Sequence, residues 1–327
     1  MKILTILLGR IGDMILLTPF FELIKEKYPE SQIEVIASRH NYIVLKNNPN
    51  IAKIHIYDKK ILHTLQLLSY LRLNQFDFYI DPKDHFSHES AIFANIVRAK
   101  TKIGYNKPDS HNFDIAIEDI SKHSNLHFVQ RLWLPLENLE ISLPKQPLKP
   151  ILFEDVNSSK YVEEYILKLE QSKPIICCNI SASKENKMLT TAKWIEFLKE
   201  AIKKSDFNYV LTFEPKHKIL ADEIKHSLPK IQLFSSRNLM DVISLIKQSY
   251  LVITPDTSIV HIAAAFNKPI IAFHSGIMET YVWFRPLSDV NSTIFAEEGV
   301  DDLSSIDANR IIDEFNKMLI ILQKENN

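Results

Sequence analysis

The chain has 327 residues, of which 46% are hydrophobic and 24% are charged, and its formal net charge is −1 at pH 7. This length exceeds the usual size of one hydrophobic core and predicts two domains. The composition is typical of a globular protein. The balanced charge argues against a nucleic-acid-binding protein, which usually carries a strong basic excess.

Two apolar stretches bear on the compartment in which the chain works. Residues 1–24 are interrupted by Arg10 and Asp13, and no small-residue cleavage site follows them. No other window supplies the roughly 18 uninterrupted apolar residues of a membrane span. Cys177 and Cys178 are adjacent in an apolar run, where neighbours on a strand point to opposite faces, so we expect two reduced thiols. These features predict a cytoplasmic protein.

Strands and helices alternate through the first half of the chain. The predicted strands cover 3–8, 33–37, 54–57, 76–80 and 102–105, and the predicted helices cover 14–27, 61–73, 90–99 and 125–136. Strands separated by helices imply βαβ units and a parallel sheet. Between 141 and 153, three prolines coincide with a loss of periodicity, which predicts a linker.

The alternation restarts after the linker. Strands are predicted over 175–180, 209–213, 231–234, 251–254 and 269–273, and helices over 160–169, 191–203, 216–226, 239–248 and 305–323, with irregular chain after 273. We therefore predict an α/β protein with two doubly wound parallel-sheet domains, 1–150 and 151–327, whose last helix could pack back on the first domain. Ligands of such sheets bind at the carboxyl ends of the strands, which points to the interdomain cleft.

The most informative segment follows the strand 251–254. Asp256, Thr257 and Ser258 are residue types that cap a helix N-terminus, where backbone N–H groups and the helix dipole favour an anion. His261 lies four residues after Thr257 on the same helix face. Helix capping explains the first three residues, but it does not require a histidine one turn later. The segment therefore predicts a phosphate or diphosphate site.

A glycine-containing loop links the first strand to the first helix. Gly9 and Gly12 flank Arg10, and Asp13 follows at the start of the helix. Asp13 could act as a general base at the cleft or merely cap the helix, and the local sequence does not separate the two interpretations. The glycines do not form the G-x-G-x-x-G pattern of dinucleotide-binding proteins.

Two polar loops supply further candidates. The loop after strand 175–180 carries Ser183 and Lys187, which could bind phosphate oxygens or could simply be solvated. The loop 81–89 is rich in acids and histidines, among them Asp84, His85 and His88. His85, His88 and Glu89 are metal-ligand types, but no second cluster with ligand spacing supports a metal site, so we expect a loop that contacts substrate and no metal.

Several of these segments together resemble glycosyltransferase family nine, the bacterial heptosyltransferase family. Residues 7–19 resemble its opening motif, and residues 256–269 are similar to its C-terminal motif. Lys187 stands before the helix with Trp194, as the donor-phosphate lysine of the family does, and residues 102–105 resemble another family segment. The chain departs from the family at 273–276, where Phe-His-Ser-Gly replaces the usual Phe-Gly, and in the loop 81–89.

The resemblance implies a GT-B fold, with two Rossmann-like domains facing a central cleft, and metal-independent, inverting sugar transfer from a nucleotide donor. It implies ADP-heptose as the commonest donor and lipopolysaccharide or lipooligosaccharide core as the commonest acceptor, without a cofactor, and a place in the cytoplasm or at the cytoplasmic face of the inner membrane. By position, Asp13 matches the proposed catalytic base. The donor-binding positions are Gly12, Ser183, Lys187, Asp256, Thr257, Ser258 and His261. The acceptor-side candidates are Arg10, Asp84, His85 and His88.

Two other classes of protein remain open at this stage. A sugar-nucleotide-binding protein without activity needs the 256–261 segment and Lys187 but no base, and a nucleotide-sugar epimerase can share the architecture. A group of basic residues on the first domain could meet an anionic glycolipid, although a solvated charged face explains them equally well. These residues are Lys59, Lys60, Arg98, Lys100 and Lys102.

Overall fold

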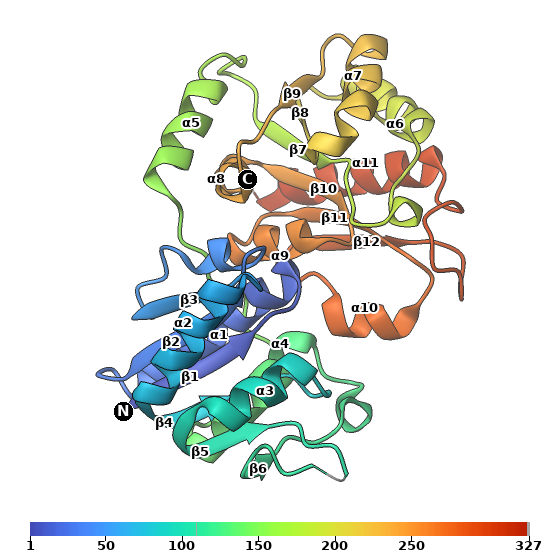
Figure 1. Cartoon of the computed structure of the whole chain (residues 1–327). Coiled ribbons are helices and arrows are strands. Elements are labelled where there is room, and N and C mark those ends of the chain that lie inside the picture. Colours follow the sequence, from blue (N-terminus) through green and yellow to red (C-terminus); the bar gives the residue numbers. More distant parts are fainter. Residues whose placement is uncertain (109, 326–327) are drawn as a thin grey trace. The chain divides into compact units, whose positions relative to one another are not determined.

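The computed structural model describes residues 1–108 and 110–325, which form two compact α/β units (Figure 1). The first unit comprises Met1–Phe153 together with Val282–Phe284. The second comprises Glu154–Tyr281 and the chain from Arg285 onward. The predicted fold class, α/β with doubly wound parallel sheets, is confirmed.

The first unit is built on a parallel sheet with strand order β3-β2-β1-β4-β5-β6. Its strands are β1 (Lys2–Leu7), β2 (Gln32–Ser38), β3 (Lys53–Tyr57), β4 (Gln75–Ile80), β5 (Arg98–Gly104) and β6 (Ile115–Ala116). Its α-helices are α1 (Ile11–Lys27), α2 (Ile61–Leu73), α3 (His88–Ile96) and α4 (Phe128–Trp133). Short 3₁₀ helices cover Tyr42–Leu45, Ile120–His123 and Leu134–Leu139.

The second unit repeats this topology, with strand order β12-β11-β10-β7-β8-β9. Its strands are β7 (Ile175–Asn179), β8 (Asn208–Thr212), β9 (Gln232–Phe234), β10 (Leu251–Pro255), β11 (Ile270–His274) and β12 (Asn291–Phe295). Its helices include α5 (Val156–Ile166), α6 (Thr191–Lys204), α7 (Lys218–Ser227), α8 (Leu239–Gln248), α9 (Ser258–Ala265) and α11 (Ala308–Glu325). Helix α10 (Met278–Phe284) begins in this unit and ends in the first.

Burial on both faces explains why the central strands read as continuous apolar runs. Every residue of β7, β10 and β11 is buried, as expected for parallel strands covered by helices on both sides. In each sheet the strand order reverses beside its first strand, between β1 and β4 and between β7 and β10. Ligands of open α/β sheets bind beyond the carboxyl ends of the strands at such reversal points.

Helix α1 follows β1 and is buried on nearly all sides from Met14 to Ile24. It contains Pro19, whose missing N–H cannot bond the carbonyl of Ile15. The Thr18 hydroxyl replaces that donor at 2.6 Å from the Ile15 oxygen, and it accepts a hydrogen bond from the Ile151 N–H at 2.8 Å. The helix is therefore fixed to the end of its own unit despite the proline.

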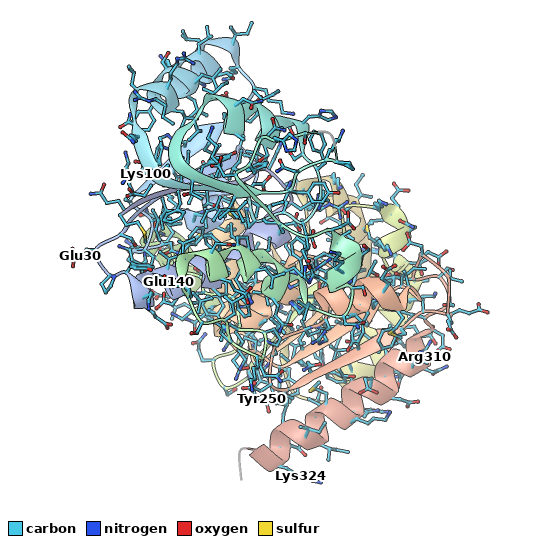
Figure 2. The ribbon with its side chains drawn as sticks, turned by 90° about the horizontal axis from the view of Figure 1, so that it is seen from below. Glu30, Lys100, Glu140, Tyr250, Arg310 and Lys324 are labelled. Atoms are coloured by element: carbon cyan, nitrogen blue, oxygen red, sulfur yellow. The ribbon has the colours of Figure 1, made fainter. Side chains whose placement is uncertain are left out.

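The structure differs from the sequence prediction in the last fifth of the chain. The segment predicted as irregular contains α10 and β12, and β12 pairs in parallel with β11 along its whole length. The sequence leaves open whether the last helix packs on the first domain. Helix α11 belongs to the second unit, where Phe315 packs on α6. Figure 2 labels Arg310 and Lys324 along this helix.

Two other expectations concern the cysteines and the membrane. Cys177 and Cys178 are buried and not bonded to each other, and burial raises the pKa of the Cys177 thiol to about 12. Both thiols are therefore protonated and unreactive at neutral pH. Among the helices of the described residues, none combines the length and the apolar character needed to cross a membrane.

Candidate functional site

The carboxyl end of β10 carries the segment that the sequence singles out. Only Asp256 and Thr257 separate β10 from α9, and both are half-buried, as is Ser258 at the first helical position. Thr257 caps α9: its backbone is extended, and its hydroxyl oxygen accepts a hydrogen bond from the Ile259 N–H at 3.3 Å. The N-terminus of α9 therefore lies at the reversal point of the second sheet, in the orientation that favours an anion.

Asn179 at the end of β7 braces this turn across the reversal point. Its side-chain amide donates to the Thr254 hydroxyl and to the Ser181 carbonyl, both at 2.9 Å, and lies 3.5 Å from the Thr257 hydroxyl. The sequence places Asn179 near the end of a predicted strand, 175–180, but does not mark it as a site residue. Its role depends on Thr254, which is 75 positions away in the chain.

His261 lies within α9, and only 4% of its surface is exposed. Burial lowers the pKa of its imidazole from 6.5 to about 4, because the charged form loses its hydration. The ring is therefore neutral at pH 7 and offers a hydrogen bond but no positive charge.

This burial predicts a specific pH dependence of stability. The unfolded chain takes up a proton on His261 below pH 6.5 and the folded chain does so only near pH 4, so stability is lost as the pH falls through that window. We expect the wild type to lose about 3 kcal/mol more of its free energy of unfolding across the window than His261→Gln. Urea unfolding at a series of pH values measures the difference. Parallel pH profiles for the two proteins would contradict it.

His274 ends β11 beside this turn, and the sequence marks it only as part of the departure from the family pattern at 273–276. Its Nδ1 donates to the Ser275 carbonyl at 2.6 Å, and its Nε2 lies 3.5 Å from both the Asp256 carboxylate and the Thr280 hydroxyl. The rings of Tyr281 and Phe295 pack against it. An imidazole thus contacts Asp256 where the resemblance leads one to expect glycine.

Lys187 lies in a short 3₁₀ turn and forms an ion pair with Asp301, whose carboxyl pKa it lowers. The neighbouring Asn186 strengthens this contact, since its side chain donates to the Asp301 carbonyl at 2.6 Å. The Lys187 side chain is only partly exposed. Ser183, which comes before the turn, is exposed.

Hydrogen bonds between the Gly276 backbone and residues 299–300 position Asp301 beside Lys187. The Gly276 N–H donates to the Val300 carbonyl at 2.8 Å, and the Gly276 carbonyl accepts from the Gly299 N–H at 2.9 Å. A Cβ atom on Gly276 would lie 1.7 Å from the Glu297 carbonyl oxygen, so only glycine fits this approach. The contacts from Lys187 through Asp301 and residues 274–276 to Asp256 form one continuous polar site in the second unit.

This close approach predicts a large effect of a single methyl group. Gly276→Ala must push the backbone at 297 aside, and we expect a loss of about 1–3 kcal/mol of stability together with weaker nucleotide binding. Gly299→Ala is the matched control: it meets no atom within 4 Å and suffers only from its positive φ of 78°. Thermal unfolding and ADP titration of both variants test this. An unchanged Gly276→Ala protein would refute the assigned role.

In the first unit, Asp13 lies in the first turn of α1. Its Oδ2 accepts a hydrogen bond from the Arg10 N–H at 3.1 Å, and a Cβ atom on Gly9 would lie 2.6 Å from that oxygen. Asn41 holds the same loop through the carbonyls of Leu7 and Gly9, at 2.9 and 3.1 Å. Gly12, next to Asp13, is half-buried in the same helical turn.

The capping role of Asp13 therefore exists, but it uses only one carboxylate oxygen. The hydrogen bonds among the described residues leave Oδ1 of Asp13 unused. Burial raises the pKa of the carboxyl group, while the Arg10 N–H and the charges of Lys83, Arg10 and His85 oppose this rise. A raised pKa and a second oxygen are compatible with a general base.

The loop 81–89 divides into buried and exposed residues. Asp84 and Arg131 form an ion pair at 3.1 Å with side chains only 1% exposed, so the Asp84 carboxylate is unavailable to an acceptor and instead holds the loop in place. His85 is exposed, with Nδ1 3.4 Å from Asp84, and His88 is exposed beside Phe86. Within the part of the chain that is described, no group of three or more His, Cys, Asp or Glu residues is arranged to hold a metal ion.

Comparisons with known proteins agree with this architecture. The family model described as glycosyltransferase family 9 (heptosyltransferase) matches residues 64–299. The lipooligosaccharide heptosyltransferase 2 of Haemophilus ducreyi is 24% identical over 361 residues, which cover 98% of this chain and 99% of that protein.

Two solved structures show the fold. The Escherichia coli ADP-heptose lipopolysaccharide heptosyltransferase II has a TM-score of 0.80 and 22% identity over 100% of both chains. The E. coli heptosyltransferase WaaC with ADP has a TM-score of 0.78 and 14% identity, covering 97% of this chain and 100% of that one. The fold is therefore GT-B. Since the family model spans most of the sequence, the chain is a glycosyltransferase and belongs to glycosyltransferase family 9.

Proposed function

We propose that this enzyme transfers heptose from ADP-heptose to a hydroxyl group of a lipopolysaccharide or lipooligosaccharide core, with inversion and without a metal ion or cofactor. The observation that carries the proposal is the continuous polar site of the second unit, where the N-terminus of α9, His261 and Lys187 suit a diphosphate. The names of the relatives, which are heptosyltransferases of surface glycolipids, support the choice of sugar and acceptor. An acceptor of this kind implies work at the cytoplasmic face of the inner membrane.

In the proposed reaction, an acceptor oxygen attacks the anomeric carbon of the donor in line with the departing ADP. The new C–O bond forms as the bond to the diphosphate breaks, and the acceptor proton passes to the Asp13 carboxylate. General bases of this kind contribute about 10²–10⁴-fold to rate. Asp13 has a raised pKa, which brings its proton affinity closer to that needed near neutral pH.

The second half of the proposal concerns the negative charge on the leaving ADP. Backbone N–H groups of the α9 N-terminus and the Lys187 ammonium are fixed donors that can meet this charge. Neutral His261 would add a hydrogen bond from the same helix. On the acceptor side, we propose that Arg10 and His85 contact anionic groups of the core, because both side chains lie near enough to Asp13 to act on its carboxyl group and both can donate hydrogen bonds.

The direct test is an assay with purified enzyme, ADP-heptose and a lipooligosaccharide acceptor that lacks the terminal heptose. We expect ADP release, a mass gain of one heptose on the acceptor, and undiminished activity in EDTA. A panel of ADP-, GDP-, UDP- and CMP-linked sugars tests the donor by thermal shift, with ADP expected to stabilise most. Sugar conversion without any acceptor would identify an epimerase instead. Binding without turnover would identify a non-catalytic protein.

A further inference from the structure

Helix α2 of the first unit exposes an apolar face. Leu67 and Leu71 point into the core, but Ile61, Leu62, Leu65 and Leu73 are all exposed, Ile61 and Leu73 by 80% and 81%. At 100° per residue these four fall on one arc of the helix. Ile61, Leu62 and Leu65 are neighbours in the first two turns, and the exposed Ser69 and Arg72 separate them from Leu73 on the same arc. Single exposed leucines are ordinary, whereas an apolar strip of neighbouring side chains on one helix face favours an interaction surface.

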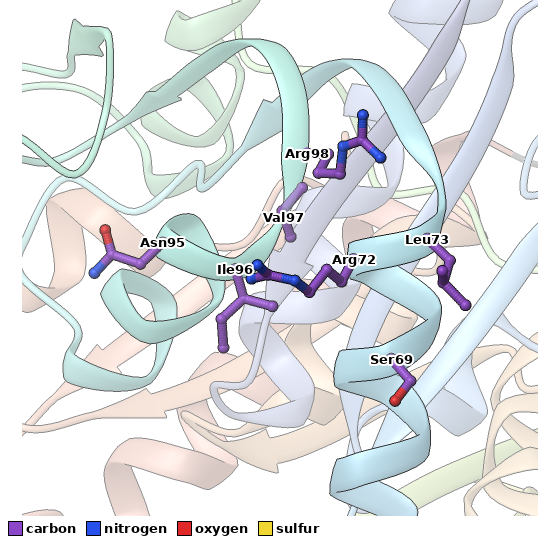
Figure 3. Close-up of a pocket in the computed structure, with 7 residues that line it drawn as sticks. All are labelled: Ser69, Arg72, Leu73, Asn95, Ile96, Val97 and Arg98. Carbon is purple, nitrogen blue, oxygen red and sulfur yellow. The ribbon is translucent and has the colours of Figure 1, made fainter.

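A groove of about 680 Å³ lies beside this strip, between the ends of α2 and α3 and the start of β5 (Figure 3). Its polar lining is Ser69 and Arg72 from α2, Asn95 from α3 and Arg98 from β5. Figure 3 shows Arg72 reaching from α2 toward the end of α3, with Arg98 on the adjoining strand. Two guanidinium groups with a hydroxyl and an amide suit phosphate oxygens.

Most lysines around the strip are paired with acids, whereas the two arginines of the groove are not. Lys59, Lys60 and Lys100 form ion pairs with Glu89, Asp58 and Asp77, respectively. Arg72 and Arg98 form no ion pair with any residue in 1–108 or 110–325. The Lys102 ammonium donates to the Ala94 carbonyl and has no acidic partner among the described residues. The net positive charge of this surface is therefore carried by the two arginines and Lys102.

We propose that α2 and this groove, Ile61 to Leu73 with Arg98, form a docking surface for an anionic phospholipid bilayer. The exposed side chains enter the interface between headgroups and acyl chains, and Arg72 and Arg98 bind lipid phosphates. Contact with a second copy of the chain is the alternative occupant, and sedimentation of the α2 variants distinguishes it from membrane binding.

The orientation of α2 fits a membrane-borne acceptor. Its first residue follows the carboxyl end of β3, and its last residue precedes the amino end of β4. A helix lying flat on the bilayer therefore leaves the carboxyl edge of the sheet, which carries Asp13, open at its side. This agrees with the proposed function, but vesicle binding needs neither donor nor acceptor and is tested separately.

Flotation with vesicles tests the proposal on the full-length protein. We expect binding to vesicles of phosphatidylcholine mixed with phosphatidylglycerol, weak binding to phosphatidylcholine alone, and a loss of binding at high salt. Arg72→Ala with Arg98→Ala should weaken binding roughly five-fold per arginine at low salt. Leu62→Ser with Leu65→Ser should weaken it roughly ten-fold or more, because apolar burial in the interface is lost.

Matched controls come from the second unit. Arg310→Ala removes an exposed arginine, and Leu167→Ser with Ile219→Ser removes two exposed aliphatic side chains; these variants should bind vesicles like wild type. Inorganic phosphate that replaces chloride at constant ionic strength should not compete with the vesicles for the protein. Three outcomes would overturn the proposal: no vesicle binding by the wild type, equal effects of the controls, or α2 variants that lose self-association in sedimentation instead of vesicle binding.

Discussion

The Asp13→Asn enzyme is expected to turn over about 10²–10⁴-fold more slowly than the wild type, with unchanged affinity for ADP. Asparagine keeps an oxygen that can accept the Arg10 N–H, so the cap of α1 survives and only the base is removed. Steady-state kinetics and ADP titration measure the two quantities separately.

Asp13→Ala supplies the matching control for this experiment. It removes both roles and should cost about 1 kcal/mol of stability in addition to activity. If the asparagine variant keeps full turnover while the alanine variant is merely less stable, Asp13 is only a helix cap. In the wild type, activity should fall at acid pH as the Asp13 carboxyl group is protonated, and this acid limb should disappear from the residual activity of the asparagine variant.

Lys187→Ala is expected to lower kcat by about 10²–10³-fold and to weaken ADP binding, because a fixed cation at the leaving group is lost. Asp301 makes this test sharper. Without the ammonium, the Asp301 carboxylate remains at the site, and its charge opposes that of the diphosphate. We therefore expect Lys187→Ala with Asp301→Asn to bind ADP better than Lys187→Ala alone.

Lys203→Ala is the control for this second prediction. Lys203 forms a comparable ion pair with Glu200 on the exposed side of α6, away from the α9 N-terminus, so its removal should change neither kcat nor ADP affinity. Calorimetric titration measures the ADP affinity of each variant. Equal ADP affinity in Lys187→Ala and wild type would remove the lysine from the donor site.

The central architecture could be predicted because it rests on local patterns. Apolar runs such as 175–179 and 251–255 are buried on both faces, and the helices between them carry caps that the sequence displays, such as Thr190 and Thr257. The short strands β6 and β12 lack such a pattern. β12 reads as polar chain, and it is a strand because β11 offers it a hydrogen-bonding edge.

The residues of the candidate site could likewise be predicted only where their signal is local. Asp13 and the segment 256–261 stand where a strand turns into a helix, and that signal is local. The partners Asp301 of Lys187 and Arg131 of Asp84 lie 114 and 47 positions away, and no local pattern connects them. Asp84, an acceptor-side candidate by sequence, is held in a buried ion pair that its own segment does not reveal.

Both departures from the family pattern, at 81–89 and at 274–276, begin where a strand of the sheet stops. The strands before them are interior to their sheets, and each segment is held by buried contacts of its own: Asp84 by Arg131, and 274–276 by the backbone at 297–300. Exchange of either segment alone is therefore expected to destabilise the protein, because the residues that hold it would no longer match. A graft into a homologue has to carry Arg131 together with 81–89, or 297–301 together with 274–276.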